Sequence, residues 1–85
     1  MRNNDTAVRY VKIDSVLIGD TIRVETIDED IKETKTGTVA YRDYTADGHY
    51  LYTSKGKVIA FVPRDGLNRP KISLLNRRLT GMVLF

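Results

Sequence analysis

The sequence predicts a small all-β domain, and three observations lead to this fold class. β-Branched and aromatic residues dominate the 85-residue chain. No stretch repeats apolar residues at the 3.6-residue period of a helix, and Gly, Asp and Pro turn signals recur at short intervals. A chain of this length forms one domain with a small core. We therefore expect a five- to six-stranded barrel over residues 7–85, preceded by a disordered leader at residues 1–6.

The N-terminal half is expected to hold two strands and one long loop. The first strand, 8–13, leads into a turn at 14–19 whose Val-Leu-Ile run is expected to lie under the barrel. The turn closes with Gly-Asp, because glycine tolerates a positive φ and the Asp20 carboxylate can accept backbone N–H bonds. Residues 21–27 alternate apolar and polar side chains as a strand does, and the charged segment 28–35 is expected to be a long exposed loop.

Two tight turns organise the C-terminal half into hairpins. Asp47-Gly48 suits a type I′ turn, and Lys55-Gly56 marks a second tight turn. The Gly- and Pro-bounded segment 63–70 is expected to be a loop. The expected strands are 36–45, 49–54, 57–62 and 71–76, and residues 79–85 are expected to add a last strand or dock on the core.

These turns predict which side chains share a face of the sheet. Tyr44 is expected opposite Leu51, Tyr52 opposite Ile59 and Tyr50 opposite Phe61. The face with the greater apolar volume is expected to form the core, and it carries Val39, Tyr41, Tyr50, Tyr52, Ile59 and Phe61. The other face, expected to be partly covered by the N-terminal strand, the tail or a second copy, carries Ala40, Arg42, Tyr44, His49, Leu51, Thr53, Val58, Ala60 and Val62.

The order of these features over residues 15–76 resembles the SH3-like small barrels. In that family a Gly-Asp opens the first barrel strand, and a Gly-x-Val, here within "TGTV" (36–39), opens the second after a long loop. Two tight hairpins and a last strand, here "KISLLN" (71–76), complete the pattern. The resemblance implies a binding module and leaves its ligand open. The aromatic groove for proline-rich peptides is not indicated, since the paired Tyr motif and Trp are missing. A small basic barrel also resembles many phage-encoded proteins.

The sequence does not indicate catalysis, a metal or a cofactor. The single histidine, His49, lies beside a hairpin tip and is expected to be exposed, and Asp43 is expected on the opposite face from it. The acidic segment 28–33 lacks the fifth ligand and the sixth-position Gly of a calcium loop. One His without any Cys does not make a zinc site, and no phosphate-binding loop is present. We therefore expect a non-enzyme without cofactor, metal or small-molecule substrate.

The distribution of apolar residues favours a cytoplasmic protein that does not contact a membrane. The longest purely apolar run is 58–62, which is far shorter than a membrane span. The polar N-terminus does not have the apolar stretch of a signal peptide, and the absence of Cys excludes a disulfide framework.

Charge is distributed unevenly along the chain, whose net charge is +3. Residues 1–54 carry seven Lys/Arg against ten Asp/Glu, and residues 55–85 carry seven against one. This asymmetry indicates a basic surface for an anion or pairing of acidic with basic faces, unless the fold mixes the charges. The first hypothesis is a DNA- or RNA-binding module that contacts the backbone phosphates, with Tyr44 stacking on a base. Its predicted contact residues are Arg42, Tyr44, Lys55, Lys57, Arg64, Arg69, Lys71, Arg77 and Arg78.

The alternative is a module that binds a protein partner or assembles with itself. The chain ends in the apolar segment "GMVLF". If this segment does not dock on its own domain, it forms an exposed patch of the kind that partners bind. The predicted interface residues are Met82, Val83, Leu84 and Phe85.

Overall fold

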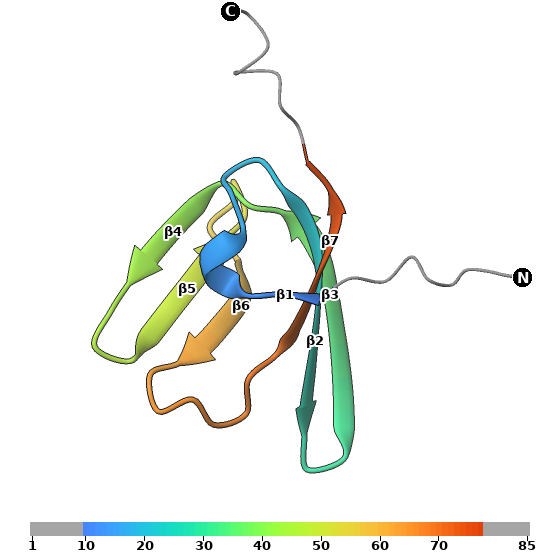
Figure 1. Cartoon of the computed structure of the whole chain (residues 1–85), viewed down its shortest axis with the longest axis vertical. Coiled ribbons are helices and arrows are strands. Elements are labelled where there is room, and N and C mark those ends of the chain that lie inside the picture. The colour runs from blue at the N-terminus through green and yellow to red at the C-terminus, as the bar shows by residue number, and fades with distance from the viewer. Residues whose placement is uncertain (1–9, 78–85) are drawn as a thin grey trace, which may run out of the picture.

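The computed structural model describes residues 10–77, which form seven strands and one short 3-10 helix (Figure 1). The elements are β1 (Tyr10–Val11), η2 (Ile13–Ser15), β2 (Thr21–Asp28), β3 (Ile31–Thr38), β4 (Tyr41–Tyr44), β5 (Gly48–Tyr52), β6 (Val58–Pro63) and β7 (Lys71–Asn76). The all-β class is confirmed. The expected leader at 1–6 and the expected last strand at 79–85 lie outside the described residues.

The strands form two antiparallel sheets. The first has the order β1-β7-β2-β3 and the second the order β4-β5-β6. The chain changes sheet between β3 and β4, where the Val39 N–H donates to the Asp20 carbonyl (2.9 Å) and the Ala40 N–H to the Tyr52 carbonyl (2.8 Å). Between residues 10 and 77 the sheets do not close into the expected single barrel, because β3 meets β6 through side chains rather than through backbone hydrogen bonds.

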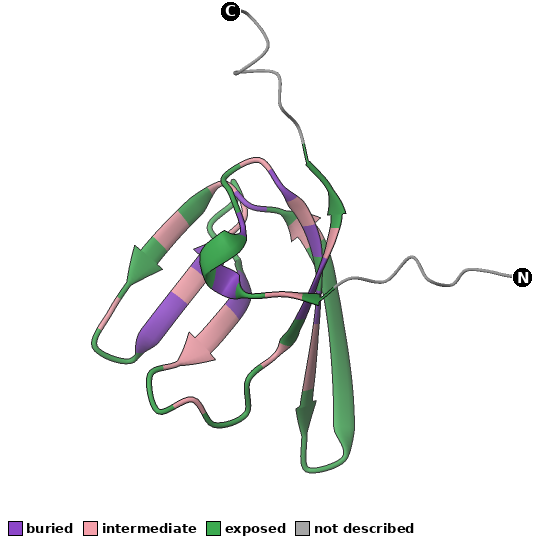
Figure 2. Ribbon diagram, viewed as in Figure 1, coloured by how far each residue is buried: buried purple, intermediate pink, exposed green. Residues whose placement is uncertain are grey.

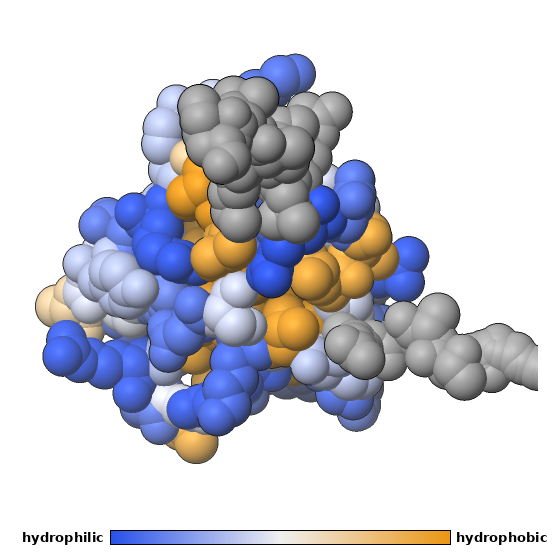
Figure 3. All heavy atoms as spheres, turned by 45° about the horizontal axis from the view of Figure 1, so that its top comes forward, coloured by the Kyte–Doolittle hydropathy of each residue, from blue (hydrophilic) through white to orange (hydrophobic). Residues whose placement is uncertain are grey.

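The core lies between the two sheets, and buried residues gather where β2, β5 and β6 face each other (Figure 2). The first sheet contributes Ile22, Val24 and Ile72, and the second contributes Leu51, Ile59 and Ala60. Val39 and the two ends of the η2 region, Ile13 and Val16, complete the buried cluster. Of the apolar run expected under the barrel, only Val16 is buried. Apolar side chains also gather on the face shown in Figure 3.

In the second sheet, the face that the sequence predicted to form the core is mostly the outer face, which points toward solvent. His49, Leu51 and Ala60, expected on the other face, are buried, whereas Tyr41 is 57% exposed. The remaining aromatic rings form a layer of their own, with ring centroids 4.5 Å apart for Tyr50–Phe61 and 5.9 Å for Tyr50–Tyr52. Aliphatic side chains fill the core at high density, while an outer tyrosine keeps its hydroxyl in water.

A β-bulge explains why Ile59 is nevertheless buried as expected. The register shifts between Leu51 and Tyr52, so that Tyr52 lies opposite Val58 rather than Ile59. The expected pairing of Tyr50 with Phe61 is confirmed on the other side of this bulge. Bulges change the direction of the side chains that follow them.

The expected loop at 28–35 is instead part of a hairpin. β2 and β3 pair over eight residues, from Thr21 opposite Thr38 to Asp28 opposite Ile31. Glu29 and Asp30 form the turn with φ values of 49° and 71°, the two positive φ angles of a type I′ turn. Glu-Asp is an unusual pair for that turn, and β3 is exposed along almost its whole length (Figure 2), so it shows no apolar alternation.

The β4–β5 turn differs by one position from the expected type I′ turn. Thr45 and Gly48 exchange backbone hydrogen bonds of 2.8 and 3.2 Å, so Ala46 and Asp47 form the loop. Tyr44 therefore lies opposite His49 rather than Leu51. The glycine is needed inside the strand because a side chain there would meet the backbone of β6.

The β5–β6 turn is confirmed near Lys55-Gly56, with one residue more than a two-residue loop. The Thr53 N–H donates to the Lys57 carbonyl (2.8 Å), and Gly56 has a φ of 82°. A glycine with positive φ at the end of a three-residue loop is typical of such hairpins.

Candidate functional site

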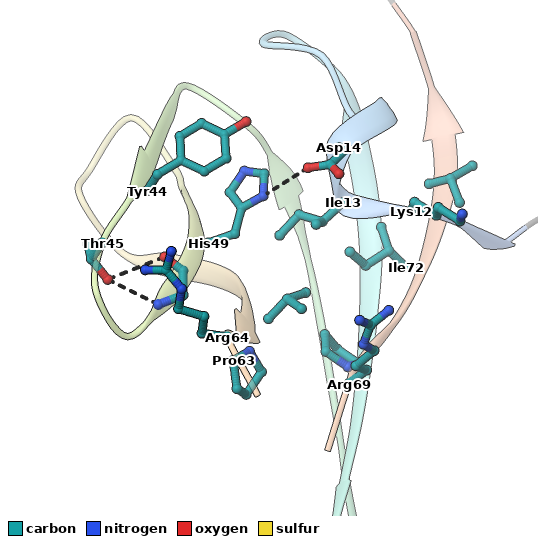
Figure 4. A pocket seen from close by; sticks show the side chains of 14 residues that line it. Lys12, Ile13, Asp14, Tyr44, Thr45, His49, Pro63, Arg64, Arg69 and Ile72 are labelled. Atoms are coloured by element: carbon teal, nitrogen blue, oxygen red, sulfur yellow. Dashed lines mark hydrogen bonds and ion pairs between the residues drawn. The ribbon is translucent and has the colours of Figure 1, made fainter. Parts of the chain in front are cut away.

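A cleft of about 590 Å³ opens between η2, the β4–β5 hairpin and the loop that joins β6 to β7 (Figure 4). Its floor is apolar, and its rim carries most of its polar side chains. The floor consists of Val11, Ile13, Val62, Pro63, Pro70 and Ile72. The polar and aromatic side chains are those of Lys12, Asp14, Tyr44, Thr45, His49, Arg64 and Arg69.

Tyr44 and His49 form an aromatic pair on one side of the cleft. Their ring centroids are 4.2 Å apart and the rings are tilted by 33°. They lie directly opposite each other on β4 and β5, next to the hydrogen-bonded pair Thr45–Gly48. Non-hydrogen-bonded positions bring side chains closest together, which explains the contact. Tyr44 is 66% exposed and His49 only 8%, so the tyrosine covers the histidine and presents its own ring to solvent.

His49 is buried, contrary to the expectation of an exposed hairpin histidine. Its Nδ1 lies 3.4 Å from Asp14 Oδ1, which reaches it from η2 (Figure 4). Burial lowers the pKa of His49, the nearby charge of Arg42 lowers it further, and Asp14 opposes both effects. The imidazole is therefore neutral near pH 7. Its Nε2 is buried without a hydrogen-bond partner among the described residues.

Arg42 lies behind this pair and holds η2 in place. Its Nη2 donates to the carbonyls of Ile13 (3.1 Å) and Val16. Carbonyl groups at the end of a helix have no hydrogen-bond partner within the helix. The Arg42 guanidinium supplies the missing donors, so its role in the fold is structural. Arg42 was predicted to contact nucleic acid, and the structure places its guanidinium on the protein backbone.

Arg64 and Arg69 stand on the two sides of the cleft mouth (Figure 4). Both are exposed, and neither forms an ion pair with any residue between 10 and 77. The loop between them starts with a turn in which the Gly66 N–H donates to the Pro63 carbonyl (3.1 Å). Gly66 has a φ of 79°, and a Cβ there would lie 3.4 Å from the Arg69 guanidinium. The turn thus lets Arg69 lie across the loop.

Lys12 adds a third cation at the cleft, next to η2. Asp14 is the only acidic residue among the cleft-lining side chains of the described chain, and it is directed at His49. Three cations and one carboxylate leave the cleft with a net positive charge, because His49 is neutral.

The remaining predicted contact residues do not join this cleft. Lys55 and Lys57 lie in the turn before β6, at the opposite end of that strand from Arg64, and six strand residues span about 17 Å. Lys71 lies on the first sheet with its Nζ 5.6 Å from the centroid of the Tyr10 ring. Arg78 and the predicted interface residues Met82, Val83, Leu84 and Phe85 lie outside the described residues.

Arg77 is engaged within the fold by a buried carboxylate. Its Nε and Nη2 donate to Asp20 at 3.0 and 2.9 Å, and its Nη2 also donates to the Ser15 carbonyl (3.0 Å). Asp20 is 1% exposed and also accepts the Leu17 N–H (2.8 Å). Gly19-Asp20 is therefore turn chemistry, as predicted, although the carboxylate caps an upstream N–H rather than a downstream one.

Sequence reasoning missed Lys12 and Asp14 as cleft residues. Asp14 lies within η2 and Lys12 directly precedes it, in a segment expected to be strand and turn. Nothing in their spacing connects them to the distant hairpin. The position of His49 beside Tyr44 could have been found, since both were expected on one sheet face. The sequence placed Leu51 rather than His49 directly opposite Tyr44, because the β4–β5 loop lies one position earlier than expected, and it did not identify that face as the inner one.

Neither a protein-family model nor a curated protein nor a solved structure matches this chain. Between residues 10 and 77, no group of three or more His, Asp or Glu side chains is arranged to hold a metal ion. In the same range no helix is long and apolar enough to cross a membrane. The chemistry of the cleft is therefore the basis for a functional proposal.

Proposed function

We propose that this protein is a non-catalytic module that binds single-stranded nucleic acid, DNA or RNA, in the cleft. The observation that carries the proposal is the combination of two arginines without acidic partners in the described chain and an apolar floor beside an exposed tyrosine ring. The resemblance of the sequence to SH3-like small barrels supports a binding role.

Each part of the cleft matches one part of a nucleotide. The Arg64 and Arg69 guanidiniums can donate two parallel hydrogen bonds to a phosphate. The exposed ring of Tyr44 offers a stacking platform, and base–aromatic stacking contributes about 1–3 kcal/mol per base. A cleft of about 590 Å³ is within the size range that holds one nucleotide-sized group. The bases contribute through their flat faces, so we expect little sequence preference.

Paired charge variants test the position of the phosphates. We expect Arg64→Ala/Arg69→Ala to weaken binding of a fluorescent single-stranded oligonucleotide by about tenfold or more, measured by anisotropy at several salt concentrations. Losing two phosphate contacts should also reduce the slope of log K against log salt by about 1.4. Lys55→Ala/Lys57→Ala removes the same charge at the other end of β6 and should have a smaller effect. Equal effects of both double variants, or no binding at low salt, would contradict the proposal.

A tyrosine pair tests the stacking. Tyr44→Ala should weaken binding by about 5- to 150-fold while leaving the salt slope unchanged, because stacking does not release counterions. Tyr41→Ala removes another exposed tyrosine from the same strand but from its opposite face. It is expected to bind like the wild type. A Tyr44→Ala variant with wild-type affinity would exclude the stacking platform.

A further inference from the structure

β3 is the edge strand of the four-stranded sheet, and its outer backbone groups can be identified. Antiparallel strands alternate residues that hydrogen-bond toward one neighbour with residues that point to the other side. The Val39 N–H donates to the Asp20 carbonyl (2.9 Å), which continues the register of Ile22 with Gly37. Odd-numbered residues of β3 therefore bond to β2, and even-numbered residues point outward.

The direction of Ala40 agrees with this alternation. Its N–H points away from β2 and donates to the Tyr52 carbonyl (2.8 Å) in the second sheet. The outward groups of Lys32, Thr34 and Thr36 have no such strand beside them among the described residues, since β3 ends the sheet order. All six residues from 31 to 36 are exposed. An edge of this length is a template for another strand.

We propose that two copies of this chain pair through β3, antiparallel, with the two-fold axis at Thr34. In this register Thr34 faces the partner's Thr34 and Lys32 faces the partner's Thr36, so that all outward groups of these residues meet. Glu33 then lies opposite the partner's Lys35, and by symmetry the pair occurs twice. The two four-stranded sheets become one continuous sheet. A two-fold interface of this kind is self-complementary and closed.

Charge selects this register over its neighbours. The hydrogen-bonding alternation allows shifts only in steps that keep even-numbered residues paired with even-numbered residues. Moving the two-fold axis to position 33 places Glu33 opposite the partner's Glu33, and moving it to position 35 places Lys35 opposite the partner's Lys35. Like charges directly opposite each other destabilise a strand pair, whereas opposite charges stabilise it. Only the axis at Thr34 brings opposite charges together at the centre.

Of the two lysines on β3, Lys32 is already neutralised within the protomer, and Lys35 meets the partner's Glu33 in the proposed register. Edge lysines commonly prevent strand pairing. The Lys32 Nζ lies 3.0 Å from Glu25 Oε2, on the face of the sheet opposite to Glu33 and Lys35. Its charge is therefore compensated before any second strand approaches.

The exposed apolar side chain of β3 also finds a place in this dimer. Ile31 is 66% exposed and falls opposite the partner's Gly37. Gly37 is covered by Ile59, whose Cδ1 lies 2.8 Å from where a Cβ would be. A second cleft of about 540 Å³ opens there, lined by Lys35, Thr36, Thr53, Lys57, Val58 and Ile59. The Ile31 side chain points to the face of the joined sheet on which the partner's Ile59, from β6, packs. The pairing therefore brings two apolar side chains together.

Charge exchange on the full chain, without nucleic acid, tests the proposal by sedimentation velocity. The wild type should be a concentration-dependent dimer. Glu33→Lys alone and Lys35→Glu alone each create two like-charge pairs and should weaken dimerisation by about tenfold or more. An equimolar mixture of these two variants should form a heterodimer, and the double variant E33K/K35E should form a homodimer. A monomeric wild type, or a mixture that does not associate, would overturn the proposal.

A backbone variant tests the strand pairing itself. Thr34→Pro removes an outward N–H at the two-fold axis but no hydrogen bond to β2, and edge strands tolerate proline at such positions. We expect a monomer with the wild-type circular dichroism spectrum. Asp47→Lys, in the exposed β4–β5 turn and outside the second cleft, serves as a charge control away from β3 and should remain dimeric. A dimer that survives both Thr34→Pro and Glu33→Lys must use another surface, which would also overturn the proposal. Since these measurements omit nucleic acid, their outcome is independent of the proposed function.

Discussion

The Asp20 carboxylate connects parts of the chain that are distant in sequence. It accepts a backbone N–H from the turn before β2 and two guanidinium N–H groups of Arg77 after β7. A buried carboxylate is costly unless it is paired and hydrogen-bonded, and here both conditions are met. Burial raises the pKa of Asp20, but the hydrogen bonds from Arg77 and Leu17 and the charges of Arg77 and Arg42 outweigh burial and lower it overall.

The lowered pKa of Asp20 predicts how stability depends on acid. A carboxyl group with a depressed native pKa contributes stability that is complete above its ordinary pKa of 3.8 and is lost as pH falls through the native value. We expect Asp20→Asn to reduce the free energy of unfolding by about 3 kcal/mol near pH 7. The penalty should shrink below about pH 4, as the wild type loses the same contribution. Urea unfolding at both pH values measures this, with the exposed-site variant Asp43→Asn as control; a pH-independent penalty would contradict it.

Gly48 predicts a steric cost at a single position. A Cβ there would meet the Val62 carbonyl oxygen of the neighbouring strand and lie 2.8 Å from the Phe61 ring. We expect Gly48→Ala to destabilise the fold by about 3 kcal/mol, because backbone atoms of β6 cannot move aside. Gly56→Ala, where φ is 82° but space is open, should cost only about 1 kcal/mol. Thermal unfolding of both variants decides this, and equal losses would show that backbone strain rather than packing matters at Gly48.

At the scale of elements, the β2–β3 hairpin shows where local sequence chemistry and structure disagree. Glu29 and Asp30 hold positive φ angles that Asn and Gly adopt with less strain. Glu29→Asn/Asp30→Gly should therefore stabilise the protein by about 1 kcal/mol, measured as an increased urea midpoint. The matched control is Ala46→Asn/Asp47→Gly in the β4–β5 turn, where neither residue has a positive φ. A similar gain in both turns would contradict the type I′ explanation.

The strands that could be predicted are those whose own residues specify them. Most of β2 follows from alternation, β7 follows as the strand after the Gly- and Pro-bounded loop, and the β5–β6 hairpin follows from Lys55-Gly56. β3 could not be predicted because alternation reports burial, and this strand is exposed along nearly its whole length. The inner face of the second sheet could not be predicted either, since apolar volume favours the tyrosine face. Which face is covered depends on how the first sheet and η2 pack against it, and that is a long-range property.

At the scale of the whole molecule, the candidate site also consists of features that the sequence could predict and features that it could not. Tyr44, Arg64 and Arg69 were predicted as ligand contacts, and they do lie at one cleft. The other predicted cations were expected to share a surface because they are close in sequence and of one sign. The fold separates them, because β6 carries Lys57 and Arg64 to opposite ends of the sheet and Arg77 turns toward Asp20. Composition indicates the sign of the charge on a surface, whereas the topology of the strands decides where each charged residue lies.

Burial of His49 gives the whole fold a second acid-sensitive group. Its effect on stability is expected at a higher pH than the effect of Asp20, so the two can be measured separately. Burial and the charge of Arg42 lower the pKa of His49 below its ordinary value of 6.5, although Asp14 acts in the opposite direction. Below pH 6.5 the unfolded chain therefore binds a proton that the native state does not, so stability falls as pH falls toward the native pKa. One proton limits the slope to about 1.4 kcal/mol per pH unit.

His49 is the chain's single histidine, so no other side chain with an ordinary pKa titrates in this range. We expect the urea midpoint of the wild type to decrease between about pH 7 and pH 5.5. His49→Gln should remove this decrease, because glutamine keeps a polar side chain at the site and does not take up a proton. The Asp20→Asn variant should retain the decrease, since the Asp20 carboxyl group that it removes titrates only at lower pH. A wild type with a flat profile above pH 5.5 would mean that His49 is accessible enough to be protonated in the folded protein, which its position beneath Tyr44 argues against.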